Sequence, residues 1–256
     1  MIQLKLLNTG WKTGLLATLE RHPNIRRKLL WLVCMLHGNE LDFRHLFCHC
    51  DGGNGTSGPN SFKGPLGQSC TRNDIHEMDV VDFRKIPSNI LELEEPVVQE
   101  LSRDQNLLYR YIKAIDSGVL PEHLVGQVPG PPCHARWLTL AVRLMILYTR
   151  TAVPCCGLNK VVNYIVQVYG PSWFAIKCKP KFTAGPSHLF NKIKLIRDTQ
   201  SLEVQHIVKK HIQRNAYLSE PGVMLLSMLE SQEKEIRVKA MKIIQYNRSR
   251  PQMFPK

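Results

Sequence analysis

The chain has 256 residues, of which 43% are apolar and 21% charged, an ordinary composition for a globular protein with a sizeable core. Its eight cysteines are irregularly spaced and indicate no disulfide framework. No apolar run approaches the roughly 20 residues of a membrane-spanning helix, and the N-terminus lacks the features of a signal peptide. We therefore expect no membrane span and an intracellular location, with one large domain or two small ones.

The net charge of +13 is unevenly distributed along the chain. Residues 1–100 carry 11 Lys and Arg against 12 Asp and Glu, whereas residues 101–256 carry 23 against 9. A basic surface attracts phosphate backbones by releasing their counterions. Basic surfaces also occur on proteins that bind no nucleic acid, so charge alone leaves both interpretations open.

The first 50 residues predict a helix, a strand and a second helix. Apolar positions between Trp11 and Arg21 recur at helical spacing, and Pro23 closes the segment. The continuous apolar run from Leu29 to Met35 has the length of a buried strand. The apolar residues from Leu36 to Phe47 suit a helix that buries one side.

A loop and an acidic connector follow. Residues 51–67 are dense in Gly, Ser, Asn and Pro, a composition typical of a loop. The connector reaches residue 100, and its alternating stretch over residues 78–86 predicts one further strand. We accordingly divide the chain into residues 1–50, 51–100 and 101–256.

The remainder of the chain is predicted to be a helical bundle. A first apolar stripe runs from Leu107 to Ile115 and is ended by Gly118. Further helical patterns cover residues 137–148, 161–173, 186–197, 201–214, 221–230 and 233–244. The expected fold is mostly α with a small α/β portion at the N-terminus.

Cysteines and histidines cluster at the junction of the first two parts. Cys34 and His37 have the C-x-x-H spacing of metal ligands, and His45, Cys48, His49 and Cys50 follow. Structural zinc is usually held by two spaced pairs, and here the second pair is poorly formed. The alternative places Cys34 in the buried strand as an inert thiol, with His37 capping the turn after it. A nucleophilic Cys34 would need a base that sequence alone does not position.

Carboxylates offer a second kind of site. Glu40, Asp42, Asp51 and Glu220 could hold Mg²⁺ for phosphoryl transfer if the fold brought two or three of them together. Exposed carboxylates are more commonly solvated, and the sequence shows no convergence.

Basic residues form the densest charged set in the chain. Arg136 stands beside Trp137 and could contact phosphate or a base, although Trp137 also heads an apolar stripe and suits core packing. The other basic residues of this set are Lys177, Lys179, Lys181, Lys192, Lys194, Lys209, Lys210 and Arg214. They form either a solvated helix surface or one that follows phosphates.

Several motifs occur in an order that resembles a family of transposable-element-derived proteins found in arthropod genomes. They are NTGWKTGLL, LLWLVCMLHGNELDFRHLF, DGGNGTSGPNSFKGPLG, HARWLTLAVRLMILYTR, YGPSWFAIK and SEPGVMLLSML. That family is in turn similar to the hAT-type transposases, whose catalytic core is ribonuclease-H-like and carries a large helical insertion. The resemblance implies an incomplete ribonuclease-H-like N-terminal segment followed by a helical bundle.

The resemblance also assigns roles to individual residues. Cys34 and His37 would match the C-x-x-H motif that follows a core strand, and Ala135 to Trp137 the tryptophan motif of the insertion. Of three catalytic acids, only the last has a match, at Glu220, because no Asp precedes Asp42. Two-metal strand transfer needs several carboxylates. We therefore expect a truncated or decayed transposase-like protein without catalysis, and no cofactor unless a full set of acids binds Mg²⁺.

The partner implied by this interpretation is DNA, which would make the protein nuclear. The residues expected to contact DNA are Arg136, Lys192, Lys194, Lys209, Lys210 and Arg214. Two alternatives stay open: a helical protein-interaction scaffold with incidental charge, and an active Mg²⁺-dependent transposase or nuclease. Oligomerisation is compatible with each.

Overall fold

The computed structural model describes residues 15–24, 34–53, 62–131, 137–181, 184–215, 218 and 221–249. Within these ranges the protein is mostly helical and contains no β-strand. The elements are α1 (Leu15–Arg21), α2 (Met35–Cys50), α3 (Pro65–Cys70), α4 (Glu95–Gln99), α5 (Arg103–Ser117), η2 (Glu122–Leu124), α6 (Trp137–Thr149), α7 (Cys156–Tyr164), η3 (Ile165–Tyr169), α8 (Gly170–Cys178), α9 (Gly185–Thr199), α10 (Leu202–Arg214), α11 (Pro221–Leu229) and α12 (Lys234–Ser249). None of these helices is long and apolar enough to cross a membrane.

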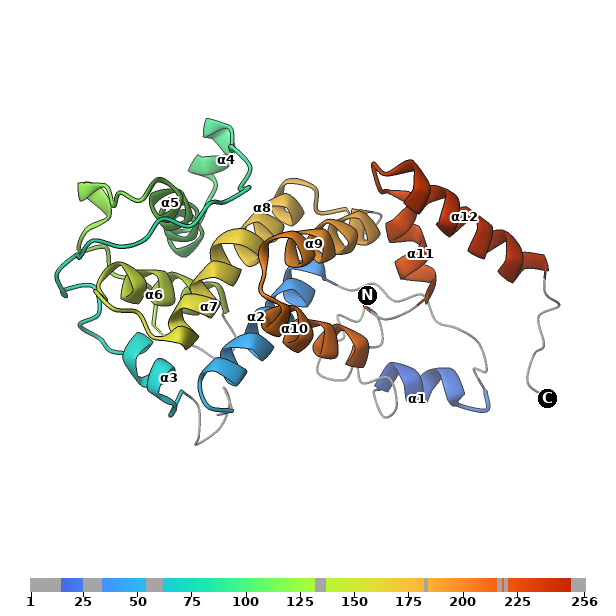
Figure 1. The fold of residues 1–256 in the computed structure, drawn as a ribbon, viewed down its shortest axis with the longest axis horizontal. Coiled ribbons are helices and arrows are strands. Elements are labelled where there is room, and N and C mark those ends of the chain that lie inside the picture. The colour runs from blue at the N-terminus through green and yellow to red at the C-terminus, as the bar shows by residue number, and fades with distance from the viewer. Residues whose placement is uncertain are drawn as a thin grey trace.

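The helices form an elongated bundle whose two ends are built by different parts of the chain (Figure 1). One end holds α3, α4, α5 and α6, and the other holds α11 and α12 (Figure 1). The α2 helix and the α7–α8 segment lie between these ends, where α2 packs against α6, α7, α8 and α10. Residues from all three sequence ranges share one core, to which Phe43, Ile75 and Tyr111 each contribute a fully buried side chain.

The α5 helix confirms the prediction from its apolar stripe. All five apolar residues of the stripe, Leu107, Leu108, Tyr111, Ile112 and Ile115, are buried. Ser102 and Gln105 form a reciprocal capping box at the start of the helix. Gly118 ends the helix with a φ of 81°, a left-handed conformation that glycine adopts at little steric cost.

Trp137 packs in the core, the more conservative of the two expectations for this residue. Its side chain is 4% exposed. The indole ring lies 5.6 Å from the ring of Phe43 and 6.0 Å from that of Phe47, in both cases edge to face. Trp137 therefore joins α6 to α2 and is not available to stack on a nucleic-acid base.

The α7, η3 and α8 elements form one continuous helix that widens in its middle. Pro171 has no N–H, and a proline inside a helix clashes with the carbonyl four residues earlier. Here the backbone takes a π-helical turn before it, and the N–H of Gly170 bonds the carbonyl of Ile165. Because the Val166 carbonyl then lacks a helical donor, the Ser88 hydroxyl donates to it at 2.7 Å. The proline is thus accommodated by a residue of the connector.

The structure differs from the two strand predictions where it describes those residues. Residues 29–33 lie outside the described ranges, but Met35 is helical, as the first residue of α2. Cys34 precedes α2 as its N-cap, and its side chain is exposed and not buried in a strand. A short apolar run has no periodicity that separates strand from helix, which is why this prediction was wrong at its end.

The connector over residues 78–86 is extended but pairs with no strand. The N–H of Val81 donates to the carbonyl of Thr149 at 3.1 Å, and the N–H of Ile86 donates to that of Ile115 at 3.0 Å. Both acceptors lie in the last turn of a helix, where carbonyls lack intrahelical partners. The predicted strand is therefore an extended segment whose N–H groups donate hydrogen bonds to carbonyls in the last turns of α5 and α6.

Replacing Trp137 tests the junction between α6 and α2. Trp137→Ala should lower the free energy of unfolding by about 3–5 kcal/mol because it removes a buried aromatic side chain and leaves a cavity. Chemical denaturation followed by circular dichroism measures this loss. Val153→Ala is the matched control, since Val153 is 86% exposed, and its unfolding midpoint should hardly move. Equal losses in both variants would contradict the assignment.

Candidate functional site

A buried ion pair joins α2 to α9. Asp42 is fully buried and Lys192 is 3% exposed, and the Lys192 ammonium contacts Oδ2 of Asp42. Asp42 lies on the inward stripe of α2, between Asn39 and Leu46, and Lys192 lies on the buried stripe of α9 with Leu189 and Ile196. A buried charge is tolerated when an opposite charge compensates it. The two residues therefore hold each other inside the bundle.

Two histidines extend this pair toward the surface. Nε2 of His211, on α10, lies 3.7 Å from Oδ1 of Asp42. The rings of His211 and His45 have centroids 5.1 Å apart and are inclined by 34°. We call Asp42, His45, Lys192 and His211 the polar cluster, because together they join α2, α9 and α10.

The electrostatics of the polar cluster favour neutral histidines. Burial is the main cause that lowers the pKa of His211, and the cations Lys192, Arg44 and Arg214 lower it further, whereas Asp42 opposes them. Burial also lowers the pKa of His45, and the neighbouring His211 and Arg214 add to that effect. A proton added to either ring would be poorly solvated and close to other cations.

The other carboxylates considered as magnesium ligands are dispersed. Asp51 is fully buried at the end of α2, where its Oδ1 accepts a hydrogen bond of 2.8 Å from the N–H of Gly67 in the first turn of α3. Glu40 lies 3.7 Å from Nδ1 of His37, one turn earlier on α2. Glu220 lies outside the described residues. Asp42 and Asp51 thus have structural partners, and the three acids of the set that the structure describes share no site.

The cysteine and histidine motif has a similarly plain geometry. Cys34 is the N-cap of α2 and His37 lies in the first turn of this helix, where its Nδ1 is 3.7 Å from Glu40. Cys50 is partly buried, and this burial raises the pKa of its thiol to about 11, which makes it a poor nucleophile. Across the described part of the chain, no group of three or more His, Cys, Asp and Glu side chains is placed to hold a metal ion.

The basic residues separate into one buried and several exposed members. Lys192 was predicted to contact DNA. Its side chain is buried inside the bundle, so the prediction is wrong for this residue. Lys194 on α9 and Lys209, Lys210 and Arg214 on α10 are all exposed. On α10 this follows from its amphipathic pattern, because Val204, Ile207 and Val208 bury the opposite side of the helix. Arg136 lies outside the described residues.

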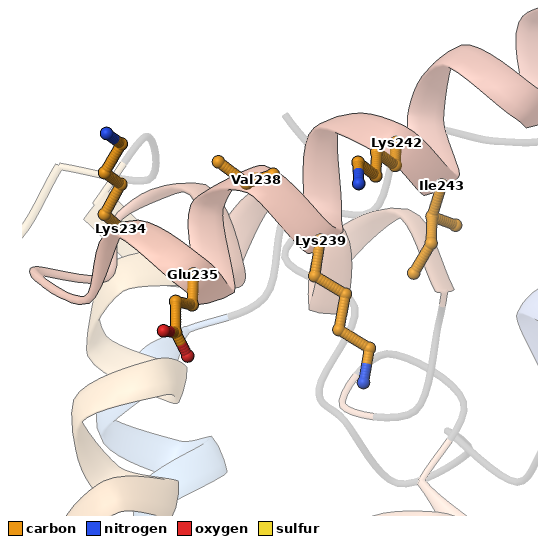
Figure 2. A pocket seen from close by; sticks show the side chains of 6 residues that line it. All are labelled: Lys234, Glu235, Val238, Lys239, Lys242 and Ile243. Atoms are coloured by element: carbon orange, nitrogen blue, oxygen red, sulfur yellow. The ribbon is translucent and has the colours of Figure 1, made fainter.

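Further exposed lysines lie on α12, although none of the residues predicted to contact DNA belongs to this helix. Lys234, Lys239 and Lys242 all project from this helix (Figure 2). None of these three, nor Lys209 or Lys210, forms an ion pair with another described residue. The sequence did contain a signal for this surface, since Lys234, Lys239 and Lys242 are spaced three to five residues apart on one helix.

Breaking the buried ion pair should be costly. Lys192→Met should lower the free energy of unfolding by about 3–5 kcal/mol, because it leaves the Asp42 carboxylate buried without its counterion. The double variant Asp42→Asn with Lys192→Met should recover part of that loss, since it removes both charges. Denaturant unfolding of both variants measures the difference.

An exposed ion pair provides the control for this comparison. Lys113 lies 2.7 Å from Glu92, and both side chains are largely solvated. Lys113→Met should therefore leave the unfolding midpoint almost unchanged. A loss for Lys113→Met as large as that for Lys192→Met would contradict the distinction between the two pairs.

The histidines predict that acid destabilises the fold. Because the pKa of His211 is lower in the folded than in the unfolded chain, the unfolded chain binds its proton first as the pH falls below about 6.5. Stability from this residue is thus complete above that pH and is lost as the pH falls toward the folded value. His211→Asn should flatten the dependence of the unfolding free energy on pH between about 7.5 and 5.5. An unchanged dependence would exclude His211 as its source.

Comparison with known proteins identifies no relative of this chain. No protein-family model matches it, and neither does any curated protein or any solved structure.

Proposed function

We propose that the protein binds duplex DNA through the exposed cations of α10 and its neighbouring helices, and that it does so without cleaving the strands. The observation that carries the proposal is the pair Lys209 and Lys210, exposed on α10 with no ion-pair partner among the described residues. Unpaired surface lysines release counterions from a phosphate backbone at little desolvation cost.

The distribution of charge over the molecule supports this proposal. Residues 185–249, which contain α9 to α12, carry 11 Lys and Arg against 6 Asp and Glu. The connector over residues 62–100 has the opposite balance, 4 against 8. The connector lies along the end of the bundle that is far from α12 (Figure 1). Such a separation gives the α9–α12 half a positive field that would attract a polyanion.

The choice of DNA comes from the resemblance to transposable-element proteins, and the choice of binding without cleavage from the dispersed acids. Two-metal chemistry requires carboxylates that share the ions. Asp42 forms an ion pair with Lys192, and Asp51 accepts a hydrogen bond from the first turn of α3. These engagements favour a binding role over catalysis.

A titration with duplex DNA tests this proposal. Fluorescence anisotropy with a labelled 30-base-pair duplex (about three helical turns) should show binding that weakens steeply with salt. Lys209→Gln with Lys210→Gln should weaken binding by roughly tenfold at low salt and reduce the slope of log K against log salt by about two. Lys113→Gln is the matched control, because Lys113 is paired with Glu92 and belongs to α5, at the end of the bundle opposite α11 and α12 (Figure 1).

The same titration separates the alternatives. Absent or salt-insensitive binding would contradict the proposal and favour a protein-interaction scaffold. Cleavage of the duplex with Mg²⁺ or Mn²⁺ that is lost in Glu220→Gln would contradict the inactive part of the proposal. Circular dichroism of each variant verifies that its helices are intact.

A further inference from the structure

The outward side of α12 combines lysines with exposed apolar side chains. Ala240 is fully buried, so the opposite side of the helix faces solvent. That side forms a shallow hollow lined by Lys234, Glu235, Val238, Lys239, Lys242 and Ile243 (Figure 2). Val238 is 40% exposed, and the nearby Met241 is 51% exposed. We call this surface the α12 face.

The α12 face suits a ligand that is both acidic and apolar. The lysine stems and the branched side chains of Val238 and Ile243 provide apolar contact, and three lysines of the lining contribute positive charge. Glu235 is the only acid in the lining, so the balance of charge is positive. Duplex DNA would satisfy the charges but not cover the apolar side chains, which distinguishes this face from the cations of α10.

The chain itself carries a segment of complementary character at its other end. Over residues 91–100, Leu91 is 46% exposed, and Glu94, Glu95 and Glu100 are exposed with no ion pair to another described residue. Glu92 is the exception, because it is bound by Lys113. We call residues 91–100 the acidic segment.

The acidic segment is held in place by its own subunit. The N–H of Leu93 donates to the hydroxyl of Tyr109 at 3.2 Å, and Leu93 and Val98 pack against the core. The exposed Leu91 and glutamates are therefore presented on a supported backbone. This reduces the conformational entropy lost when a partner binds them.

We propose that the α12 face of one copy of this chain binds the acidic segment of a second copy. The two surfaces have opposite charge, and each has exposed apolar side chains that the other would cover. They lie at opposite ends of the bundle (Figure 1), so one copy cannot satisfy both within itself. The contact is heterologous, and it joins copies head to tail into short chains or a closed ring.

The dimensions of the two surfaces agree with such a contact. The lining of the α12 face runs over ten residues, from Lys234 to Ile243, which span about 15 Å at 1.5 Å per residue. Within the acidic segment the five-residue helix α4 spans about 8 Å, and two or three extended residues beside it, at about 3.3 Å each, complete a similar length. The contact is small, so association should be weak, evident at tens of micromolar protein, and strongly reduced by salt.

Sedimentation velocity of nucleic-acid-free protein tests this inference. The wild type should exceed the monomer mass of 29.3 kDa increasingly as its concentration rises at low salt. Lys239→Glu with Lys242→Glu should remain monomeric, and so should Glu94→Lys with Glu95→Lys, with the dissociation constant raised about tenfold or more. An equimolar mixture of these two variants should associate again, since each then offers the charge that the other lost.

Controls keep this result separate from DNA binding and from misfolding. Lys209→Gln with Lys210→Gln should associate like the wild type, whatever its affinity for DNA. Leu91→Ser should weaken association even where salt has screened the charges, because it removes apolar contact. A wild type that stays monomeric at every concentration would overturn the inference. So would single variants that associate normally, or a mixture that fails to associate when the wild type does.

Discussion

The ion pair between Asp42 and Lys192 is the constraint on which the arrangement of the second half of the molecule depends. It joins α2, which packs in the central core, to α9, which begins the basic end of the bundle. His211 adds α10 to the same contact. Because a buried charge is costly without its partner, α9 and α10 can dock on α2 only in an alignment that keeps these groups together. This alignment also determines which side of α10 faces solvent, and the exposed cations lie on that side.

The charged residues therefore fall into two groups, one buried and structural and the other exposed to solvent. The first group is buried: Asp42 and Lys192 form an ion pair, and Asp51 accepts a hydrogen bond from the first turn of α3. Lys209, Lys210 and the lysines of α12 lie outside, where they remain available to a polyanion or an acidic partner. A sequence count of basic residues combines both groups, and only the burial of each side chain separates them.

Most helices could be predicted from the sequence because their signals are local. The stripe of α5, its Gly118 end, and the pattern of α10 each lie within about four turns of chain. The burial of Lys192 depends on Asp42, which lies in a distant part of the sequence, so no local pattern reveals it. A signal was nevertheless present, since Lys192 is three residues after Leu189 and four before Ile196, in register with a buried stripe.

The strand prediction over residues 78–86 was wrong for a different reason. An extended segment needs a hydrogen-bonding partner, and residues 78–86 find theirs at the ends of α5 and α6 instead of in a sheet. Alternation of apolar and polar residues indicates extended backbone but does not identify its partner. The ribonuclease-H-like portion implied by the resemblance was expected in residues 1–50, and most of its predicted strand, residues 29–33, lies outside the described ranges, within which no strand is present.

Amine-reactive labelling of the native protein, quantified for each lysine by mass spectrometry, tests the division between inner and outer charges most directly. Lys192 should stay unlabelled until the protein is denatured, while Lys209, Lys210, Lys239 and Lys242 should react rapidly. Rapid labelling of Lys192 in the native protein would contradict the buried ion pair and, with it, the proposed arrangement of α2, α9 and α10.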